Sequence, residues 1–405
     1  MTQPGSSPRL LVPDVARGLA LLGIAMANAP TFWFLNDAEE PADYFGGAYS
    51  ALDKATVLIT SVTTHVRGLP MFATLLGFGV GLIVLSLWRR SFPAQRTRAV
   101  LVRRYGFLAL FGALHGIFLF SGDIMFYYGL IGICLAFMFT ASNKVLMTVA
   151  WVTLVVGQLM GVSIAIGFYF SEVSTAELTE SAAPDTYGAL LMDNLLNFAT
   201  DLPAWVFFAI EYAFVFLIGF VWARSGTLAD VAAHRRELVA WACVCVVVSL
   251  GCGLPWGLSA LGMINPDLEP FFMLLNNSVG LLCGPGILAL LALLLDGWQR
   301  RLAAGAALPL WLAIPAALGK RSMSGYLFQS IVFAVLCYPF FLGLDLDAFG
   351  IAAVAFAIWA VSLALAWWLE KLGKPGPFEW AHRRLSYGPT MRPTLAAAGL
   401  PDRAS

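Results

Sequence analysis

The sequence predicts an all-α, polytopic integral membrane protein with about ten transmembrane helices and both termini in the cytoplasm. Of the 405 residues, 60% are hydrophobic and only 12% are charged, whereas soluble proteins carry about 25% charged residues. Several apolar runs reach the roughly 20 residues that a helix needs to cross a bilayer, and they lack the alternation typical of β-barrel strands. The basic residues also sort to one side of these runs, as in helical membrane proteins.

Ten apolar runs account for the predicted spans. They cover approximately residues 16–36, 69–88, 102–121, 124–140, 146–170, 203–223, 238–261, 270–296, 322–342 and 349–369. With a cytoplasmic N-terminus, this count places 22 of the 24 Lys and Arg residues on the cytoplasmic side and leaves only Lys54 and Arg67 on the other. Since cytoplasmic loops collect Lys and Arg, the sorting favours ten spans over an odd number.

The remaining segments complete the predicted domain organisation. Residues 1–15 form a cytoplasmic N-terminal segment, residues 16–370 one transmembrane helical domain, and residues 389–405 a loose cytoplasmic tail. Two stretches of intermediate hydrophobicity, 49–61 and 297–321, are expected to lie at the membrane interface or to re-enter it. The six cysteines show no metal-ligand spacing, so we expect no metal site.

A polar corner in the hairpin 102–140 is the first candidate site. His115 lies in an apolar run about seven residues before the turn Gly122-Asp123, and Tyr128 lies a similar distance beyond it. At about 1.5 Å per residue, His115 and Tyr128 are expected at similar depth and facing one another. A neutral His oriented by Asp123 or Tyr128 is suited to general-base catalysis. The alternative is a buried His bonded to a backbone carbonyl, with Asp123 capping the next helix.

Two further polar residues lie inside predicted spans. Asn28 is in the first span, where helix–helix hydrogen bonding is one explanation. Glu211 is in the sixth span among aromatic residues, so it is expected to be protonated, paired or facing a wet cavity. A proton relay, a salt bridge to Arg67 and an acid at an acceptor site all remain open.

Basic residues adjoin the cytoplasmic ends of several spans. Arg17, Lys320 and Arg321 either anchor to lipid phosphate or form a cup for a phosphate-rich cofactor. The glycines from Gly77 to Gly81 lie inside a span with no preceding strand, so they predict close helix packing and not a nucleotide-binding loop.

Several sequence blocks together resemble the YeiB-type bacterial membrane proteins, a family catalogued as a domain of unknown function. The blocks are Asp14-Val15-Ala16-Arg17-Gly18 with Asn28, Leu75-Leu76-Gly77-Phe78-Gly79, His115-Gly116 with Gly122-Asp123-Ile124 and Tyr128-Gly129, Leu217-Ile218-Gly219 with Arg224-Ser225-Gly226, Gly319-Lys320-Arg321-Ser322-Met323-Ser324-Gly325-Tyr326-Leu327-Phe328-Gln329-Ser330, and Gly376-Pro377-Phe378-Glu379-Trp380. The resemblance covers nearly the whole chain, and its C-terminal block spans residues 203–388.

That family is similar to a wider group of transmembrane acyltransferases, which includes the lysosomal heparan-α-glucosaminide N-acetyltransferase. The resemblance implies transfer of an acyl or acetyl group from cytoplasmic acyl-CoA or acetyl-CoA to an acceptor on the other face. It gives Asn28 a catalytic or acceptor-positioning role, because the spacing from Arg17 to Asn28 matches that group's first-helix motif. The group's catalytic histidine is replaced by Glu39, which leaves His115 or His65 as the base.

The leading hypothesis is therefore an acyl-CoA-dependent transmembrane acyltransferase in the bacterial plasma (inner) membrane, acting on a cell-envelope glycan or lipid. In it, Arg17, Lys320 and Arg321 bind the acyl-CoA phosphates, and His115, aided by Asp123, Tyr128 and Asn28, deprotonates the acceptor. The alternative is a transporter or lipid-handling protein without covalent chemistry. The expected partners are the bilayer and the acceptor, without nucleic acid, and a homodimer is left open.

Overall fold

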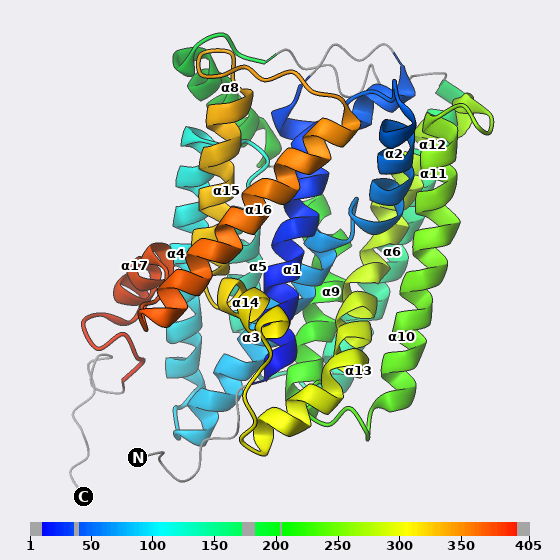
Figure 1. Ribbon diagram of the computed structural model, residues 1–405. Coiled ribbons are helices and arrows are strands. Elements are labelled where there is room, and N and C mark those ends of the chain that lie inside the picture. The colour runs from blue at the N-terminus through cyan, green and yellow to red at the C-terminus, as the bar shows by residue number, and fades with distance from the viewer. Residues whose placement is uncertain (1–9, 36–39, 172–182, 203–204, 395–405) are drawn as a thin grey trace, which may run out of the picture.

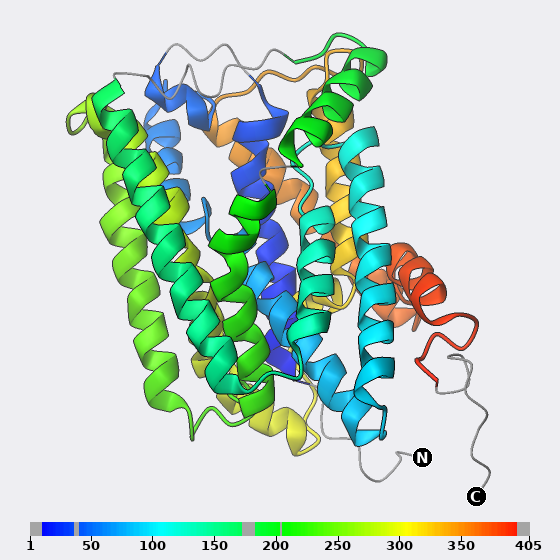
Figure 2. The same ribbon diagram turned by 180° about the vertical axis from the view of Figure 1, so that it is seen from behind.

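The computed structural model describes residues 10–35, 40–171, 183–202 and 205–394, and these residues form helices without any strand (Figure 1). The predicted all-α fold is therefore confirmed. Most helices run along one direction and surround α1 and α9 (Figures 1 and 2). The elements are α1 (Leu11–Asn28), η1 (Ala29–Trp33), η2 (Pro41–Phe45), α2 (Ala51–Thr63), α3 (Gly68–Arg89), α4 (Ala94–Phe118), α5 (Met125–Met138), α6 (Asn143–Ser171), α8 (Tyr187–Asp201), α9 (Trp205–Ser225), α10 (Arg235–Val248), η3 (Ser249–Gly253), α11 (Leu254–Ala260), η4 (Pro266–Leu268), α12 (Glu269–Val279), η5 (Gly280–Leu282), α13 (Cys283–Ala303), α14 (Leu310–Gly319), α15 (Ser322–Cys337), α16 (Ala348–Lys371) and α17 (Pro377–Tyr387).

The described residues contain eight helical stretches that are long and apolar enough to cross a membrane. They coincide with eight of the ten predicted spans, and the other two fall on the shorter apolar helices α5 and α15. With 14 residues, α5 is about 21 Å long, against roughly 30 Å for the hydrocarbon core of a bilayer. The protein is thus a multi-pass membrane protein, and the cytoplasmic position of its termini stays a prediction.

Helix α8 covers one end of the α4–α5 hairpin. We call this the outer end of the bundle, and the end with the arginine-rich turn between α3 and α4 the inner end (Figure 1). The Tyr187 hydroxyl donates to the carbonyl of Phe118 (3.0 Å), and the Asn194 amide donates to the carbonyl of Ile117 (3.3 Å). Because carbonyls in the last turn of a helix lack intrahelical donors, α8 satisfies groups that would otherwise be unpaired.

The centre of the bundle is a close contact between α3 and α9. A Cβ on Gly77 would lie 1.9 Å from the carbonyl oxygen of Phe216, and a Cβ on Gly219 would lie 2.0 Å from that of Thr74. Only glycine allows the two backbones to approach this closely. The prediction that the glycines from Gly77 to Gly81 serve helix packing is therefore confirmed.

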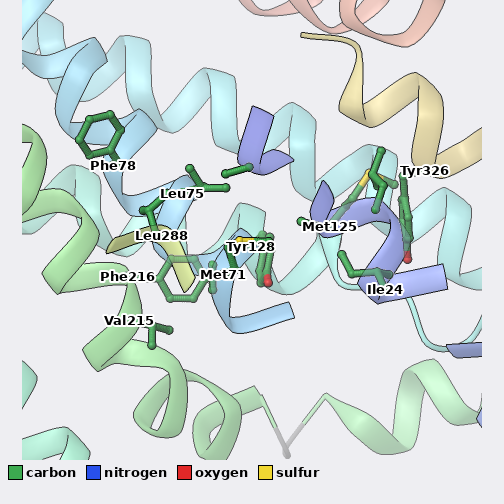
Figure 3. Close-up of a cluster of buried hydrophobic side chains, with 14 of the residues drawn as sticks. Ile24, Met71, Leu75, Phe78, Met125, Tyr128, Val215, Phe216, Leu288 and Tyr326 are labelled. Atoms are coloured by element: carbon green, nitrogen blue, oxygen red, sulfur yellow. The ribbon is translucent and has the colours of Figure 1, made fainter. Parts of the chain in front are cut away.

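Around this contact lies the apolar core drawn in Figure 3. Its labelled members come from α1, α3, α5, α9, α13 and α15, and are Ile24, Met71, Leu75, Phe78, Met125, Tyr128, Val215, Phe216, Leu288 and Tyr326. All of them are buried. Two of these core side chains, Tyr128 and Tyr326, carry hydroxyl groups, so the core is not purely apolar.

Helix α14 lies within 297–321, the second stretch of intermediate hydrophobicity. It is a ten-residue helix that packs on α1 with backbone contact at two glycines. A Cβ on Gly319 would lie 1.7 Å from the carbonyl oxygen of Asp14, and one on Gly18 would lie 2.2 Å from that of Pro315. Helix α14 is therefore packed on the bundle, and the position of the stretch 297–321 relative to the membrane interface stays a prediction.

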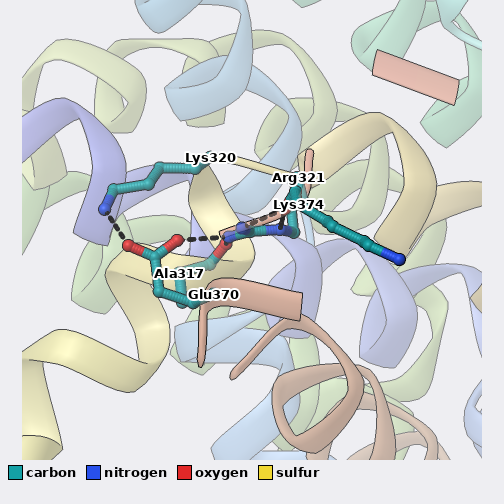
Figure 4. Close-up of polar contacts among 5 residues, drawn as sticks. All are labelled: Ala317, Lys320, Arg321, Glu370 and Lys374. Atoms are coloured by element: carbon teal, nitrogen blue, oxygen red, sulfur yellow. Dashed lines mark hydrogen bonds and ion pairs between the residues drawn. The ribbon is translucent and has the colours of Figure 1, made fainter. Parts of the chain in front are cut away.

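A polar junction joins α14, α15 and α16 (Figure 4). Both basic residues between α14 and α15 pair with the carboxylate of Glu370, Lys320 at 2.6 Å and Arg321 at 2.6 Å. The Arg321 guanidinium also donates to the carbonyls of Ala317 and Lys374. Since Arg321 is only 5% exposed, this set of partners makes it a structural residue that holds the end of α16.

Helix α17 completes the junction from the other side. The Glu379 carboxylate accepts from the backbone N–H groups of Met323 (2.8 Å) and Ser324 (3.1 Å), in the first turn of α15. A carboxylate is favourable there because the N–H groups of a first helical turn have no intrahelical acceptor. Gly376 allows the approach, since a Cβ there would lie 2.4 Å from the Ser324 Oγ. The two C-terminal sequence blocks therefore form one packed unit.

Helix α2 and Arg67 organise the outer end of the bundle. The Arg67 guanidinium, 2% exposed, donates to Asn276 Oδ1 (2.8 Å), Ser249 Oγ (3.1 Å) and the carbonyl of Val62 (3.1 Å). It makes no ion pair with Glu211, so the salt bridge considered from the sequence is wrong. The stretch 49–61 forms α2, which packs in the bundle against α11 and α16.

Candidate functional site

The turn after α4 brings His115 next to Asp123. Helix α4 ends at Phe118, and the backbone N–H groups of Leu119 and Phe120 both donate to the carbonyl of His115. His115 therefore lies in the last turn of α4, not two turns beneath the corner as the spacing predicted. This position lets Asp123, one residue before the N-cap of α5, reach the imidazole.

His115 and Asp123 form a buried pair. The His115 Nδ1 lies 2.7 Å from the Asp123 Oδ1, and each residue is 5% exposed. The second carboxylate oxygen accepts from the backbone N–H of Phe126 (2.8 Å), so Asp123 both orients the histidine and caps α5. An ionised carboxylate only accepts hydrogen bonds, so the neutral imidazole carries its proton on Nδ1 and its lone pair on Nε2.

The free nitrogen of His115 faces no acceptor or donor. Its Nε2 is fully buried and has no hydrogen-bond partner among the described residues. The ring of Tyr326 packs against the imidazole, with 5.1 Å between ring centroids. The Tyr326 hydroxyl is likewise buried and has no hydrogen-bond partner among the described residues. A basic nitrogen and a hydroxyl without partners thus lie close together in the core.

Tyr128 does not face His115, contrary to the expectation from spacing. Its hydroxyl donates to the carbonyl of Leu69 (2.9 Å), and its ring stacks on Phe72 with 6.0 Å between centroids. The aromatic partner of the histidine is instead Tyr326, more than 200 residues further along the chain.

An inner cavity of about 360 Å³ reaches Tyr326, whose ring packs on His115, but neither His115 nor Asp123 lines it. Its walls include one face of α1, from Arg17 to Ile24, and one face of α3, from Phe72 to Ile83. Seven residues of α1 correspond to about 10 Å along the helix axis. Tyr128 and Tyr326 line the same cavity, so it extends from Arg17 to the ring that covers His115.

The inner cavity is rich in basic side chains. Arg17, Arg104, Lys320 and Arg383 line it, against one carboxylate, that of Glu379. Glu379 is already bonded to the first turn of α15. Two of these cations form ion pairs, Arg17 with Asp14 (3.7 Å) and Lys320 with Glu370 (2.6 Å), so the wall keeps a net positive charge that suits an anionic ligand.

The predicted phosphate ligands separate into two groups. Arg17 reaches across the bundle to α3, where its Nη2 lies 3.4 Å from the position of a Cβ on Gly79. Lys320 lines the cavity while paired with Glu370. Arg321 does not line it, because its guanidinium is directed to Glu370 and to backbone carbonyls. Of the three, Arg17 and Lys320 are placed to meet a ligand in the inner cavity.

His382 closes the cavity from α17. Its Nε2 donates to the carbonyl of Arg104 (2.9 Å). Burial, together with the positive charges of Arg104 and Arg383, lowers the pKa of His382 to about 4. The imidazole is therefore neutral at pH 7 and adds no charge to the basic wall.

An outer cavity of about 340 Å³ lies toward the outer end of the bundle. Asn28, His65 and Glu211 line it together. Asn28 therefore shares a cavity with the second candidate base, His65, and not with His115. The His65 Nε2 is buried and has no partner among the described residues.

A thin septum separates the two cavities. Ile24 lines both of them, Leu69 lines the outer cavity, and Tyr128 lines the inner one. The hydrogen bond from the Tyr128 hydroxyl to the carbonyl of Leu69 joins the two sides of this septum. The Tyr128 side chain and the α3 backbone at Leu69 thus lie between the cavities at this point.

Sequence reasoning missed Tyr326 and Arg104 as site residues. Tyr326 belongs to the block from Gly319 to Ser330, but nothing in its local sequence indicates that it contacts His115. Arg104 lies among six arginines of one predicted inner loop and cannot be distinguished from them by composition. Only the packing of α15 and α17 against α4 identifies both residues.

Comparison with known proteins supports the resemblance found in the sequence. Residues 222–389 match the family model described as "Protein of unknown function (DUF418)". The chain is 25% identical to "Uncharacterized protein YxaH" of Bacillus subtilis (strain 168) over 94% of this chain and 95% of that protein. It is 26% identical to "Uncharacterized protein YeiB" of Escherichia coli (strain K12), over 95% and 96%. The resemblance to YeiB-type proteins is thus confirmed, and no solved structure matches.

Proposed function

We propose that this protein is a membrane-embedded acyltransferase of the bacterial inner membrane. It would take an acyl group from cytoplasmic acyl-CoA and transfer it to a cell-envelope glycan or lipid. The observation that carries the proposal is the inner cavity, which joins a basic wall to the aromatic ring covering a histidine–aspartate pair. Relatives in two bacteria favour the bacterial membrane as the location.

The basic wall supports an acyl-CoA donor. Phosphate groups bind well to arginine, which offers several N–H donors in a planar fork. Arg17, Arg104 and Arg383 provide three such groups around one cavity. Its volume of about 360 Å³ is at the small end of the roughly 300–1,000 Å³ typical of small-molecule sites. The inner cavity therefore suits the acyl chain and the pantetheine arm of acyl-CoA better than a whole CoA molecule.

The histidine pair supports acid–base chemistry at the other end of the cavity. The acceptor's hydroxyl or amine would attack the thioester carbonyl, forming an ester or amide and breaking the carbon–sulfur bond. His115 Nε2 would take the acceptor's proton and pass it to the leaving thiolate, so protons and electrons balance. Asp123 would stabilise the imidazolium formed in between. Tyr326, which covers His115, would have to turn aside to admit the acceptor.

The proposal is tested with purified protein in lipid nanodiscs. Binding of radiolabelled acetyl-CoA is measured for the wild type, for Arg17→Ala and for Arg300→Ala. Arg300 is the matched control because its side chain is 74% exposed and pairs only with Asp296 on its own helix. We expect Arg17→Ala to weaken binding about tenfold, the value of one charge-assisted contact, and Arg300→Ala to have no effect. Absence of acetyl-CoA binding to the wild type would overturn the proposal.

Transfer is tested in cells. Mass spectrometry of envelope glycans and lipids compares a deletion strain carrying the wild-type gene, His115→Ala or no gene. An acyl modification that depends on the wild type and is reduced about 10²–10⁴-fold by His115→Ala is expected if the histidine is the general base. Equal acylation in all three strains would refute the proposal.

The septum favours a transporter as the second candidate. Two cavities on opposite sides of a septum resemble the closed state of an alternating-access path. In that function Glu211 would carry protons or solute, and no covalent product would form. Proton-dependent flux in proteoliposomes, without any acylated product in cells, would favour transport over acyl transfer.

A further inference from the structure

We propose that the outer cavity binds an organic ammonium group, such as a primary amine or a quaternary ammonium, with Glu211 as its counter-ion. The comparisons assign no ligand to this cavity. The proposal rests on three features of its wall: a carboxylate without a partner, a set of aromatic rings, and polar side chains without basic ones.

Glu211 has no cation of its own. It makes no hydrogen bond or ion pair with any described residue, and it is half-buried on α9, in the wall of the outer cavity. Arg67, considered from the sequence as a salt-bridge partner of Glu211, donates hydrogen bonds to Asn276 and Ser249 instead. A carboxylate at membrane depth is costly unless it is protonated or paired. An ammonium ligand would provide the missing partner.

Aromatic side chains line the same cavity as the Glu211 carboxylate. Phe32, Tyr44, Phe208 and Tyr212 all line the outer cavity, and the rings of Phe208 and Tyr212 stack at 4.3 Å. The face of an aromatic ring carries negative potential and attracts cations, quaternary ammonium groups in particular. A carboxylate and several aromatic rings in one cavity are the groups with which proteins bind such cations.

The remaining polar groups indicate a ligand that also carries a hydrogen-bonding substituent. His65 is 3% exposed, lines the cavity, and has an Nε2 without a partner among the described residues. The Asn28 amide lines the same space. Thr31 and Thr64 are already bonded to backbone carbonyls of their own helices. A hydroxyl on the bound amine would meet His65 or Asn28.

The contrast between the two cavities decides the sign of the ligand's charge. Three arginines and a lysine line the inner cavity, whereas no Lys or Arg is among the residues that line the outer one. An anion in the outer cavity would meet the Glu211 carboxylate without compensation. The inner cavity is thus suited to anions and the outer cavity to cations.

Binding of the ammonium does not depend on acyl transfer. The bound amine is not assigned the role of acyl acceptor, because the proposed acyl transfer uses the other cavity. The two proposals can fail separately, because ammonium binding is measured without acyl-CoA and acetyl-CoA binding is measured without amine.

The test compares choline with 3,3-dimethyl-1-butanol, which has the same shape without the charge. Binding to the protein in nanodiscs is measured by calorimetry, with ethanolamine as the primary-amine probe. We expect choline or ethanolamine to bind at least about tenfold more tightly than the neutral alcohol, the contribution of one desolvated cation–carboxylate and cation–π site. Equal binding of choline and the alcohol, or no binding of either amine at high millimolar concentration, would overturn the proposal.

Two variants localise the binding. Glu211→Gln keeps the size of the side chain and removes its charge, so it should weaken choline binding about tenfold or more. Asp193→Asn is the matched control, because Asp193 is exposed on α8 and does not line the cavity. If Glu211→Gln does not fold, Tyr44→Leu replaces it and should weaken choline binding several-fold. Unchanged binding in whichever of the two variants folds would refute the site.

Discussion

Replacing Asp123 with alanine removes two hydrogen bonds at the polar corner, one to His115 in α4 and one that caps the first turn of α5. The carboxylate accepts from His115 Nδ1 at 2.7 Å and from the Phe126 backbone at 2.8 Å. Loss of a capping acceptor costs about 1 kcal/mol, and a buried donor without a partner costs about 1–3 kcal/mol. Since the groups are buried, Asp123→Ala should lower the free energy of unfolding by about 2–4 kcal/mol.

Asp123→Asn separates this structural loss from the chemistry of the histidine. An amide oxygen can still accept from Phe126, and the amide N–H₂ would then donate to His115 Nδ1. The imidazole must carry its proton on Nε2 in that arrangement, so Nε2 can no longer act as a base. We expect this variant to lose about 1 kcal/mol or less, yet to reduce any His115-dependent activity by roughly 10⁴-fold, as with the wrong tautomer of a catalytic histidine.

Unfolding in mixed detergent micelles with increasing SDS measures both variants, with linear extrapolation to zero SDS. Asp193→Ala is the control, because exposed substitutions usually change stability by no more than about 0.5 kcal/mol. Two results would refute the reasoning: an Asp123→Ala protein as stable as the Asp193→Ala control, or an Asp123→Asn protein that is less stable than Asp123→Ala.

Three further predictions test the packing, the septum and the docking of α17. Gly77→Ala should lower the free energy of unfolding by about 1–3 kcal/mol or misfold, because its Cβ would lie 1.9 Å from the Phe216 carbonyl oxygen. The control is Gly167→Ala, with no atom within 4 Å of its Cβ, which should be neutral or slightly stabilising in the same SDS titration. Leu76→Cys and Thr31→Cys, which line the inner and outer cavities respectively, should react with a membrane-impermeant maleimide from opposite sides of oriented vesicles, and labelling of both from one side would contradict the septum. The folded protein binds a proton at His382 only near its pKa of about 4, whereas the unfolded chain binds one near pH 6.5, so stability should fall as pH drops from about 6.5 to 4. Hydrogen exchange of α17 at pH 7.5 and pH 5 checks this, and His382→Gln should remove the pH dependence.

The spans could be predicted from the sequence because each of them, taken alone, must be apolar over enough residues to cross the lipid. Apolar length and the sorting of Lys and Arg are local properties, and the helices lie where they indicated. The packing role of Gly77 was predictable for the same reason, since a glycine in a span has few other uses.

The site was only partly predictable, because its contacts join distant segments. The pairing of His115 with Asp123 lies within one hairpin, and the sequence indicated it. The prediction that Tyr128 faces His115 was wrong because α4 ends at Phe118. The apolar residues continue through Phe120, so the sequence does not show where the helix ends. Arg321 had the charge expected of a phosphate ligand, but its partner Glu370 is 49 residues away in the chain.

The septum has an electrical consequence. Water and ions in the two cavities would bring each bulk solution close to Ile24, Leu69 and Tyr128 from its own side. The membrane potential, which in plain lipid falls over about 30 Å, would then fall mainly across this septum. A unit charge crossing it would gain about 2.3 kcal/mol per 100 mV. Any cation that passes from the outer cavity to the inner one would therefore be driven by nearly the whole voltage in a single step.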